Sequence, residues 1–154
     1  MNLSANFTLA ELTHSDTAIK HKLDNTPGET EVVNLKTLCE NVLQKVRDHY
    51  KKAVKVNSGF RHPLVNAAVR GSKVSDHCFG QAADIEIMGL SNPELAQWII
   101  DNLDFTQVIL EFYKQGDPNS GWVHVSYVPG NLKKEVLTAV LQDGKTVYLK
   151  GLHA

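Results

Sequence analysis

The sequence has few cysteines and no cluster of positive charge. Only two of its 154 residues are cysteines, Cys39 and Cys78, and they form neither a Cys-x-x-Cys pair nor a disulfide framework. The 16 Lys and Arg residues are balanced by 17 Asp and Glu residues, and the densest basic spots, at 51–52 and 133–134, are two residues long. Nucleic acid is therefore not an expected partner, because phosphate binding needs a clustered positive field.

The sequence also lacks long apolar runs. No stretch approaches 18 apolar residues, so we expect no membrane insertion. The N-terminus has no basic stretch followed by an apolar run, which predicts synthesis in the cytoplasm without a signal peptide. The apolar content of 42% and charged content of 21% are ordinary for a globular protein. We expect one monomeric domain over 1–154, in which a metal would serve chemistry rather than folding.

Periodicity along the chain predicts an α+β fold. Thr8 and Glu11 have the spacing of a capping box, so a short helix is expected to begin at Thr8. Further helices are expected at 31–50, at 63–69 and from Asn92 onward. Alternating patterns predict strands at 54–56, 83–87, 107–112 and 121–127, and a hairpin within 130–154 that turns at 143–144. Together these elements predict a small, mostly antiparallel sheet flanked by helices.

Three side chains on or near these strands are candidate metal ligands. His77 and Asp84 are seven residues apart, and Gly80 between them lets the chain turn. His124 lies in an alternating strand, and it would face the same ion if this strand paired beside that of Asp84. Two His and one carboxylate are a common catalytic zinc set that leaves a fourth position to water. Spacing alone leaves open that each His is an ordinary buried or surface residue.

Other polar residues near these segments allow more than one interpretation. Arg61 follows a strand end, where its guanidinium could clamp a substrate carboxylate or carbonyl, or form only a surface salt bridge. Asp76 could hydrogen-bond a ligand His. Cys78 is a poor fourth ligand, because adjacent residues such as His77 and Cys78 rarely point at one ion. Trp122 could line a pocket or pack in the core.

Three motifs in the chain resemble the zinc D-alanyl-D-alanine carboxypeptidase superfamily. They are Ser-Gly-Phe-Arg-x-Pro-x-x-Asn at 58–66, Ser-x-His-x-x-Gly-x-Ala-x-Asp-Ile at 75–85 and Trp-Val-His-Val-Ser at 122–126. The resemblance covers about 7–126, and the short phage and prophage peptidases are the most similar branch. That superfamily includes phage endolysins and bacterial L,D- and D,D-peptidases that cut peptidoglycan stem peptides.

The resemblance implies a role for each matching residue. One zinc ion is expected on His77, Asp84 and His124. Arg61 is expected to contact the substrate and assist catalysis, and Ser75 to support the substrate or the ligands.

The chain departs from the superfamily where many relatives carry the acidic general base, three residues before the last ligand His. That position is Gly121 here, and Trp122 stands where others have a His. Glu111 is the best remaining candidate for the base, because it ends a strand that could pair beside that of His124. The alternative for Glu111 is a surface residue at a strand end.

The expected function is a zinc metallopeptidase that hydrolyses a peptide bond of peptidoglycan stem peptides. The resemblance favours a phage or prophage endolysin that acts on the bacterial cell wall at host lysis. D,D-carboxypeptidase, L,D-endopeptidase and dipeptidase specificities all stay open. A non-catalytic zinc module that binds cell-wall peptide is an alternative, because Gly121 cannot act as an acid. A virion-associated protein that processes the wall is another.

Overall fold

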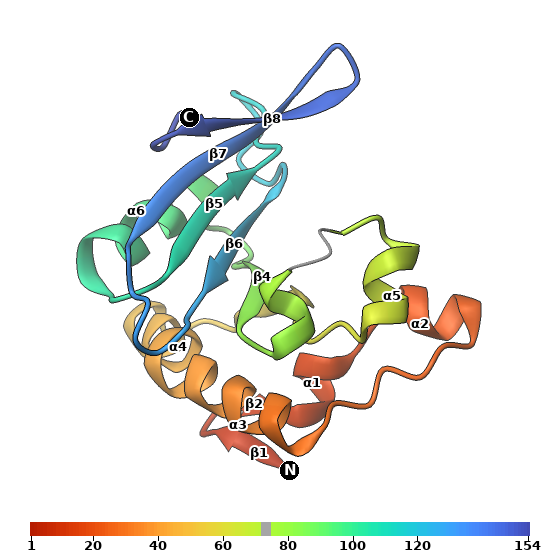
Figure 1. Ribbon diagram of the computed structural model, residues 1–154. Coiled ribbons are helices and arrows are strands. Elements are labelled where there is room, and N and C mark those ends of the chain that lie inside the picture. The colour runs from red at the N-terminus through yellow and green to blue at the C-terminus, as the bar shows by residue number, and fades with distance from the viewer. Residues whose placement is uncertain (72–74) are drawn as a thin grey trace.

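The centre of the fold is a six-stranded sheet, with strand order β3-β4-β6-β5-β7-β8. The computed structural model describes residues 1–71 and 75–154. In these ranges only β5 and β7 pair in parallel, and the other neighbours are antiparallel (Figure 1). The strand bounds are β3 Lys55–Ser58, β4 Ala82–Glu86, β5 Gln107–Glu111, β6 Trp122–Ser126, β7 Glu135–Gln142 and β8 Lys145–Lys150. The expected α+β domain with a mostly antiparallel sheet is therefore confirmed.

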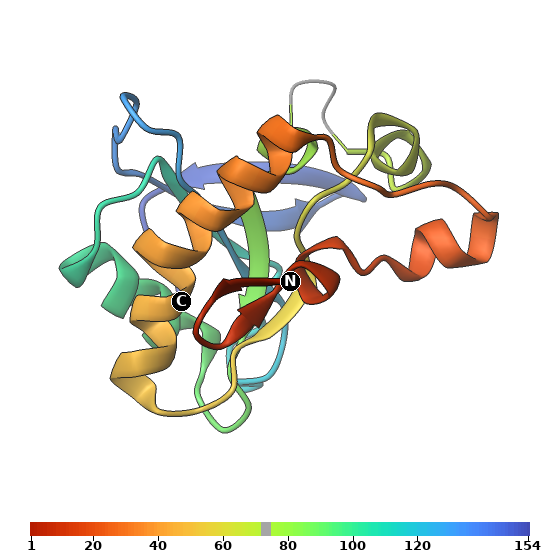
Figure 2. The same cartoon turned by 90° about the horizontal axis from the view of Figure 1, so that it is seen from below.

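A long helical segment covers one face of this sheet (Figure 2). It consists of α3 (Glu29–Leu38), the π-helical turn η1 (Cys39–Leu43) and α4 (Gln44–Tyr50). The five residues that the periodicity places on one face are all fully buried: Leu35, Leu38, Cys39, Val42 and Val46. The sequence therefore identified the buried face of this helix, although not the π-helical turn within it.

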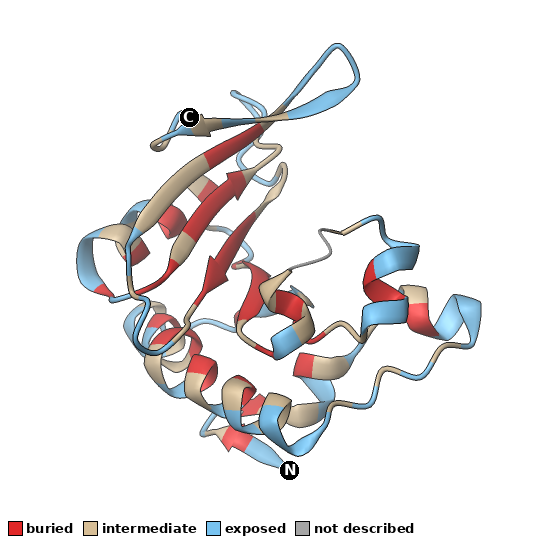
Figure 3. Cartoon of the chain, in the orientation of Figure 1, coloured by how far each residue is buried: buried red, intermediate tan, exposed pale blue. Residues whose placement is uncertain are grey.

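The hydrophobic core lies between this helical segment, helix α6 (Asn92–Asn102) and one face of the sheet. Successive strand residues point to opposite faces, so alternate positions share the core. Buried stretches run along the central strands β5 and β6 in Figure 3. The core positions of β4, β5 and β6 are fully buried: Ala83, Ile85, Val108, Leu110, Val123 and Val125. The residues between them, including Asp84 and His124, belong to the opposite face.

Short elements complete the fold, and the sheet ends in the β7–β8 hairpin. The capping box predicted at Thr8 is present, and it begins α1 (Leu9–Thr13). The β7–β8 hairpin turns at Asp143 and Gly144, where positive φ angles of 53° and 76° suit the Asp-Gly pair. The other short elements are β1 Asn2–Ser4, β2 Phe7–Thr8, α2 Asp16–His21, α5 Pro63–Ala68 and the 3₁₀ helix η2 Asp76–Phe79. None of the helices in the described part is both long and apolar enough to cross a bilayer.

Candidate metal centre and active site

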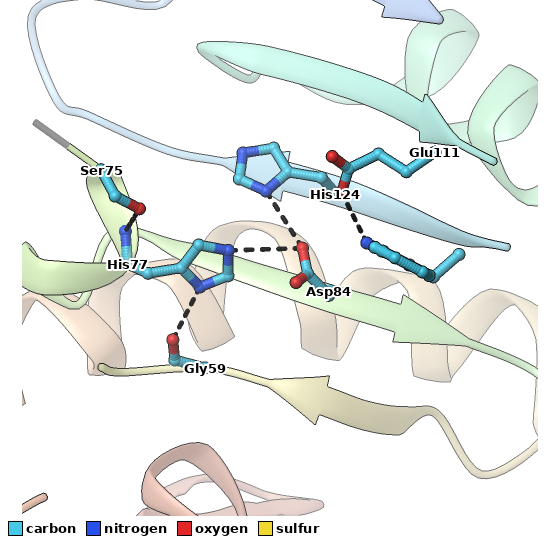
Figure 4. A network of polar contacts seen from close by, with 7 residues as sticks. Gly59, Ser75, His77, Asp84, Glu111 and His124 are labelled. Atoms are coloured by element: carbon cyan, nitrogen blue, oxygen red, sulfur yellow. Dashed lines mark hydrogen bonds and ion pairs between the residues drawn. The ribbon is translucent and has the colours of Figure 1, made fainter. Parts of the chain in front are cut away.

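The three candidate ligands converge on the sheet face that points away from the core. Asp84 and His124 are direct cross-strand partners in β4 and β6. His77 approaches from η2, which immediately precedes β4. The Oδ1 atom of Asp84 lies 3.3 Å from Nε2 of His77 and 3.1 Å from Nδ1 of His124 (Figure 4). Segments that are far apart in the sequence thus bring three donor atoms together at one point.

The geometry of this cluster fits a zinc ion. One donor atom from each residue lies within 4.8 Å of the others. Two ligands at about 2.0–2.2 Å from a tetrahedral ion are separated by roughly 3.3–3.5 Å, which is close to the distances from Asp84 to the two imidazoles. The side chains of His77, Asp84 and His124 are only 2%, 12% and 11% exposed. A nearly dry set of two imidazoles and one carboxylate is a suitable donor set for zinc.

The ionisation of two of the three ligands suits metal binding directly. At the third, His124, burial lowers the pKa, but the hydrogen bond and charge of Asp84 outweigh it and raise this pKa, so a metal ion would have to displace the proton. Burial lowers the pKa of His77, although the Asp84 carboxylate works in the other direction. Burial alone would raise the pKa of Asp84, but the charge and hydrogen bonds of His77 and His124 outweigh it and hold this pKa well below its usual range. The Asp84 carboxylate is therefore ionised, and an ionised carboxylate with a neutral imidazole is what metal ligation requires.

The orientation of His77 is fixed by a partner that sequence reasoning missed. Its Nδ1 lies 2.7 Å from the carbonyl oxygen of Gly59, to which an Nδ1–H donates, so Nε2 is the atom directed at Asp84. Gly59 can have no side chain, because an added Cβ would overlap the carbonyl oxygen of Leu12. The hydroxyl of Ser75 accepts a hydrogen bond of 3.2 Å from the backbone N–H of His77 and caps η2. Ser75 thus supports the ligand His through its backbone.

Glu111 lies on the same sheet face as the cluster. Figure 4 shows its carboxylate beside His124 and Asp84. Glu111 ends β5 directly opposite Trp122 in β6, and the indole N–H of Trp122 donates a 2.5 Å hydrogen bond to this carboxylate. Burial and the charge of Asp84 raise the pKa of Glu111, against the lowering effects of His124 and of the Trp122 hydrogen bond. A half-buried carboxylate with a raised pKa, held beside a metal site, is suited to general base chemistry.

Position 121 must be a glycine because the backbone there lies very close to the backbone of Glu111. An added Cβ on Gly121 would overlap the carbonyl oxygen of Glu111, and the φ of Gly121 is +68°. The backbone turns sharply on the other side as well, because Phe112 has a φ of 57°, which is rare for a bulky residue. An acidic side chain at position 121 is therefore incompatible with this arrangement. The carboxylate that faces the cluster comes from β5 instead.

A cleft of about 810 Å³ opens over the cluster and Glu111. Arg61, Ser75 and Trp122 line it together with the three candidate ligands. Within the described residues the buried Nε of Arg61 has no hydrogen-bond partner, and the guanidinium forms no ion pair. An unpaired guanidinium in a cleft is available for an oxygen of a bound molecule.

Asp76 and Cys78, the sequence neighbours of His77, do not belong to the ligand cluster within the described residues. Cys78 lines a second hollow of about 520 Å³, and in the described part of the chain the ligand cluster contains only His77, Asp84 and His124. Asp76 lines the main cleft, where its charge helps to raise the pKa of His124. Gly59, rather than Asp76, holds the second nitrogen of His77.

Comparison with known proteins identifies the family. The family described as peptidase M15 matches residues 5–126, about four fifths of the chain. The matched region contains every residue of the cluster, Arg61, Glu111 and Trp122, whereas β7 and β8 lie outside it. No curated protein shows a significant match to the sequence. The chain belongs to the peptidase M15 family of zinc metallopeptidases.

Proposed function

We propose that the protein hydrolyses a peptide bond in peptidoglycan stem peptides, with one zinc ion held by His77, Asp84 and His124. The observation that carries this proposal is the convergence of three donor atoms and the Glu111 carboxylate in one cleft. The family supports the reaction type, since peptidases of this family depend on zinc. The resemblance of the three motifs to wall-cutting peptidases supports the substrate class.

Glu111 is the proposed general base. Zinc in such a site acts as a Lewis acid and makes water a usable nucleophile near neutral pH. Glu111 accepts the proton of the attacking water and then passes it to the leaving amine. The hydrogen bond from Trp122 holds the carboxylate in place. The raised pKa of Glu111 increases its strength as a base.

Arg61 is proposed to bind and stabilise the substrate. Arg61 lines the cleft and its buried Nε has no partner among the described residues, so the guanidinium can hold a substrate carboxylate or the oxyanion that forms at the scissile carbonyl. Ser75 keeps the η2 turn closed beneath His77, and its place in the cleft wall also allows contact with the peptide. The Trp122 ring forms a wall of the same cleft.

A non-catalytic module that binds wall peptide is the competing function. The glycine at position 121 favoured that alternative, because the usual acid is missing there. Glu111 weakens it, since its carboxylate lines the cleft of the ligand cluster and the charges of Asp84 and His124 act on its pKa. A module that only binds would need no carboxylate with a raised pKa beside its metal.

The finer activity is proposed from the resemblance alone. It favours an endolysin of a phage or prophage, acting at host lysis as a monomer, over a virion-associated protein. The bond is one of those cut by D,D-carboxypeptidases, L,D-endopeptidases or D,D-endopeptidases. The products identify it, because a carboxypeptidase releases free D-alanine whereas endopeptidases create new amino termini within the peptide.

The test is digestion of purified peptidoglycan by the zinc-loaded protein, with mass spectrometry of the released fragments. The wild-type protein should release peptide fragments, and chelation followed by zinc addition should stop and restore the release. Glu111→Gln should retain one zinc ion and lose activity by about 10²–10⁴-fold, the range of general acid–base catalysis.

Glu40→Gln is the matched control, because Glu40 lies on η1 and forms a surface pair with Lys36. It should digest the wall at the wild-type rate. Full activity of a zinc-loaded Glu111→Gln protein would remove the base assignment. Tight binding to the wall without any released fragment would favour the binding module instead.

A further inference from the structure

The C-terminal hairpin forms one wall of the cleft, although it lies beyond the residues that match the family. The residues that line the cleft from this part of the chain are Lys133, Leu137, Thr146 and Tyr148. The parallel pairing of β7 with β5 attaches the hairpin to the strand that ends in Glu111 (Figure 1). The region outside the family match therefore contributes side chains directly to the site.

The strand register aligns Tyr148 with Glu111. Glu111 pairs with Ala139 of β7, and Ala139 pairs with Tyr148 of β8, so the three side chains form one row on one face. Neighbouring strands lie about 4.8 Å apart, which places the backbones of Glu111 and Tyr148 roughly 10 Å from each other. Ala139 between them adds only a methyl group. The row thus places a carboxylate and a phenol on the same face, on either side of the fully buried Ala139, and both of these side chains line the cleft.

The phenol of Tyr148 is a hydrogen-bond donor in the wall of this cleft. Tyr148 is 55% exposed, and its hydroxyl makes no hydrogen bond to any residue within 1–71 and 75–154. Burial and the nearby Glu111 carboxylate raise the pKa of this phenol, so it stays protonated near neutral pH. The Glu111 charge would repel a substrate carboxylate placed next to it. A neutral carbonyl oxygen is therefore the better partner for the Tyr148 O–H.

We propose that Tyr148 is a substrate-binding residue whose phenol donates a hydrogen bond to a backbone carbonyl oxygen of the bound peptide. This inference rests on the proposed function, and it assigns the β7–β8 hairpin to the wall of the substrate cleft. Tyr148 reaches the peptide from the side of the cleft formed by β8, whereas Arg61 reaches it from the segment before α5. The two residues therefore hold different parts of the peptide.

The test compares Tyr148→Phe with the wild-type protein in the hydrolysis of a synthetic stem pentapeptide. Loss of one neutral hydrogen bond to substrate should raise KM by about 3–10-fold and leave kcat within twofold. The matched control is Tyr50→Phe, which removes a partly buried phenol that packs against Trp98 and lines no part of the cleft. It should leave both constants unchanged. Zinc content and circular dichroism verify that each variant is folded and loaded.

The inference is overturned if Tyr148→Phe leaves KM within twofold of the wild type, or if only kcat falls. If the wild-type protein does not hydrolyse the pentapeptide, the proposed function fails on that substrate. The same peptide is then titrated calorimetrically into both proteins. A 3–10-fold weaker affinity of Tyr148→Phe supports the inference, and equal affinities or no binding by either protein overturn it.

Discussion

The two faces of the central sheet are built by the same strands but have opposite physical roles. On the helix-covered face, Ile85 and Val123 are fully buried among apolar side chains. One residue away, Asp84 and His124 bury polar groups on the face with the cleft. Apolar burial stabilises the fold by about 25 cal/mol per Å². Burying a charge is costly unless the charge is paired, as the carboxylate of Asp84 is with the imidazole of His124, whose pKa it raises against the effect of burial.

This difference shows that one strand register, that of β4 and β6, determines both the packing of the core and the position of the candidate ligands. Ile85 pairs with Val123, and Asp84 pairs with His124, in consecutive rows of the β4–β6 ladder. A slip of one residue would exchange the two faces and destroy both the core and the cluster. Burial of the apolar face therefore fixes the β4–β6 register, and this register places Asp84 beside His124. Substitutions on the two faces should accordingly have separable effects.

The sharpest test of this separation compares Asp84→Asn with Ile85→Ala, which change neighbouring residues of one strand. Asp84→Asn removes the charged ligand while keeping its shape, so zinc affinity and peptidase activity should fall by at least about 100-fold. Ile85→Ala leaves a cavity in the core and should lower the free energy of unfolding by about 2–5 kcal/mol. Its folded fraction should keep one zinc ion and near wild-type activity.

Zinc content, wall digestion and urea unfolding measure the two outcomes. Both proteins are compared at a temperature where Ile85→Ala is still folded. A loss of zinc binding by folded Ile85→Ala would contradict the separation of the two faces. Core packing would then affect the metal site directly, and not only through the strand register. Normal zinc binding by Asp84→Asn would remove Asp84 from the ligand set.

The second prediction concerns Gly121, where the cleft face meets the end of β5. Gly121→Ala should destabilise the protein by about 2–5 kcal/mol, because the side chain adds overlap with the Glu111 backbone to the cost of a positive φ. Gly130→Ala is the matched control, since Gly130 has a φ of +82° and nothing within 4 Å of the added Cβ. It should cost only about 1–2 kcal/mol. Equal midpoints of urea unfolding would contradict the role of this close approach.

The sequence predicted those parts of the fold that depend on local patterns. Leu35, Val42 and Val46 repeat at the helical period, and this repeat alone identifies the buried face of the helical segment from α3 to α4. The Asp143-Gly144 pair likewise specifies its own turn. The convergence of His77, Asp84 and His124 required more than spacing, because imidazoles occur at many sites. The order of the three motifs supplied that information.

Features that depend on contacts between distant segments could not be predicted. Neither the parallel β5–β7 pairing nor the β1–β2 ribbon has a local signature. The Gly59 carbonyl that holds His77 is a backbone atom, and any residue type carries one. The sequence left open whether Trp122 lines a pocket or packs in the core, and its bond to Glu111 depends on the β5–β6 register. The glycine in the Ser-Gly-Phe-Arg motif was the only available signal for Gly59.

The third prediction tests whether Trp122 acts on the cleft face by positioning Glu111. Trp122→Phe keeps an aromatic ring but removes the N–H that bonds the carboxylate. We expect kcat to fall by about tenfold, because one hydrogen bond to a charged group is lost, while KM changes less. Trp98→Phe is the control, since Trp98 stacks on His49 at the helix side of the core. A rise in KM with normal kcat would make Trp122 a substrate contact only.

The smallest expected effect compares the two cysteines, one in the core and one beside the cluster. Burial raises the pKa of Cys39 to about 12, so at pH 8 only about one Cys39 in ten thousand is a thiolate. Cys78 is half-buried, and burial raises the pKa of its thiol while the charge of Arg61 lowers it. In the folded protein, iodoacetamide should therefore modify Cys78 at least about tenfold faster than Cys39, as measured by mass spectrometry of tryptic peptides.

Modification of Cys78 should leave the zinc content unchanged, because Cys78 lines the neighbouring hollow rather than the ligand cluster. Loss of zinc on alkylation would instead place this thiol among the ligands, and equal rates for the two cysteines would mean that the core opens as readily as the cleft face.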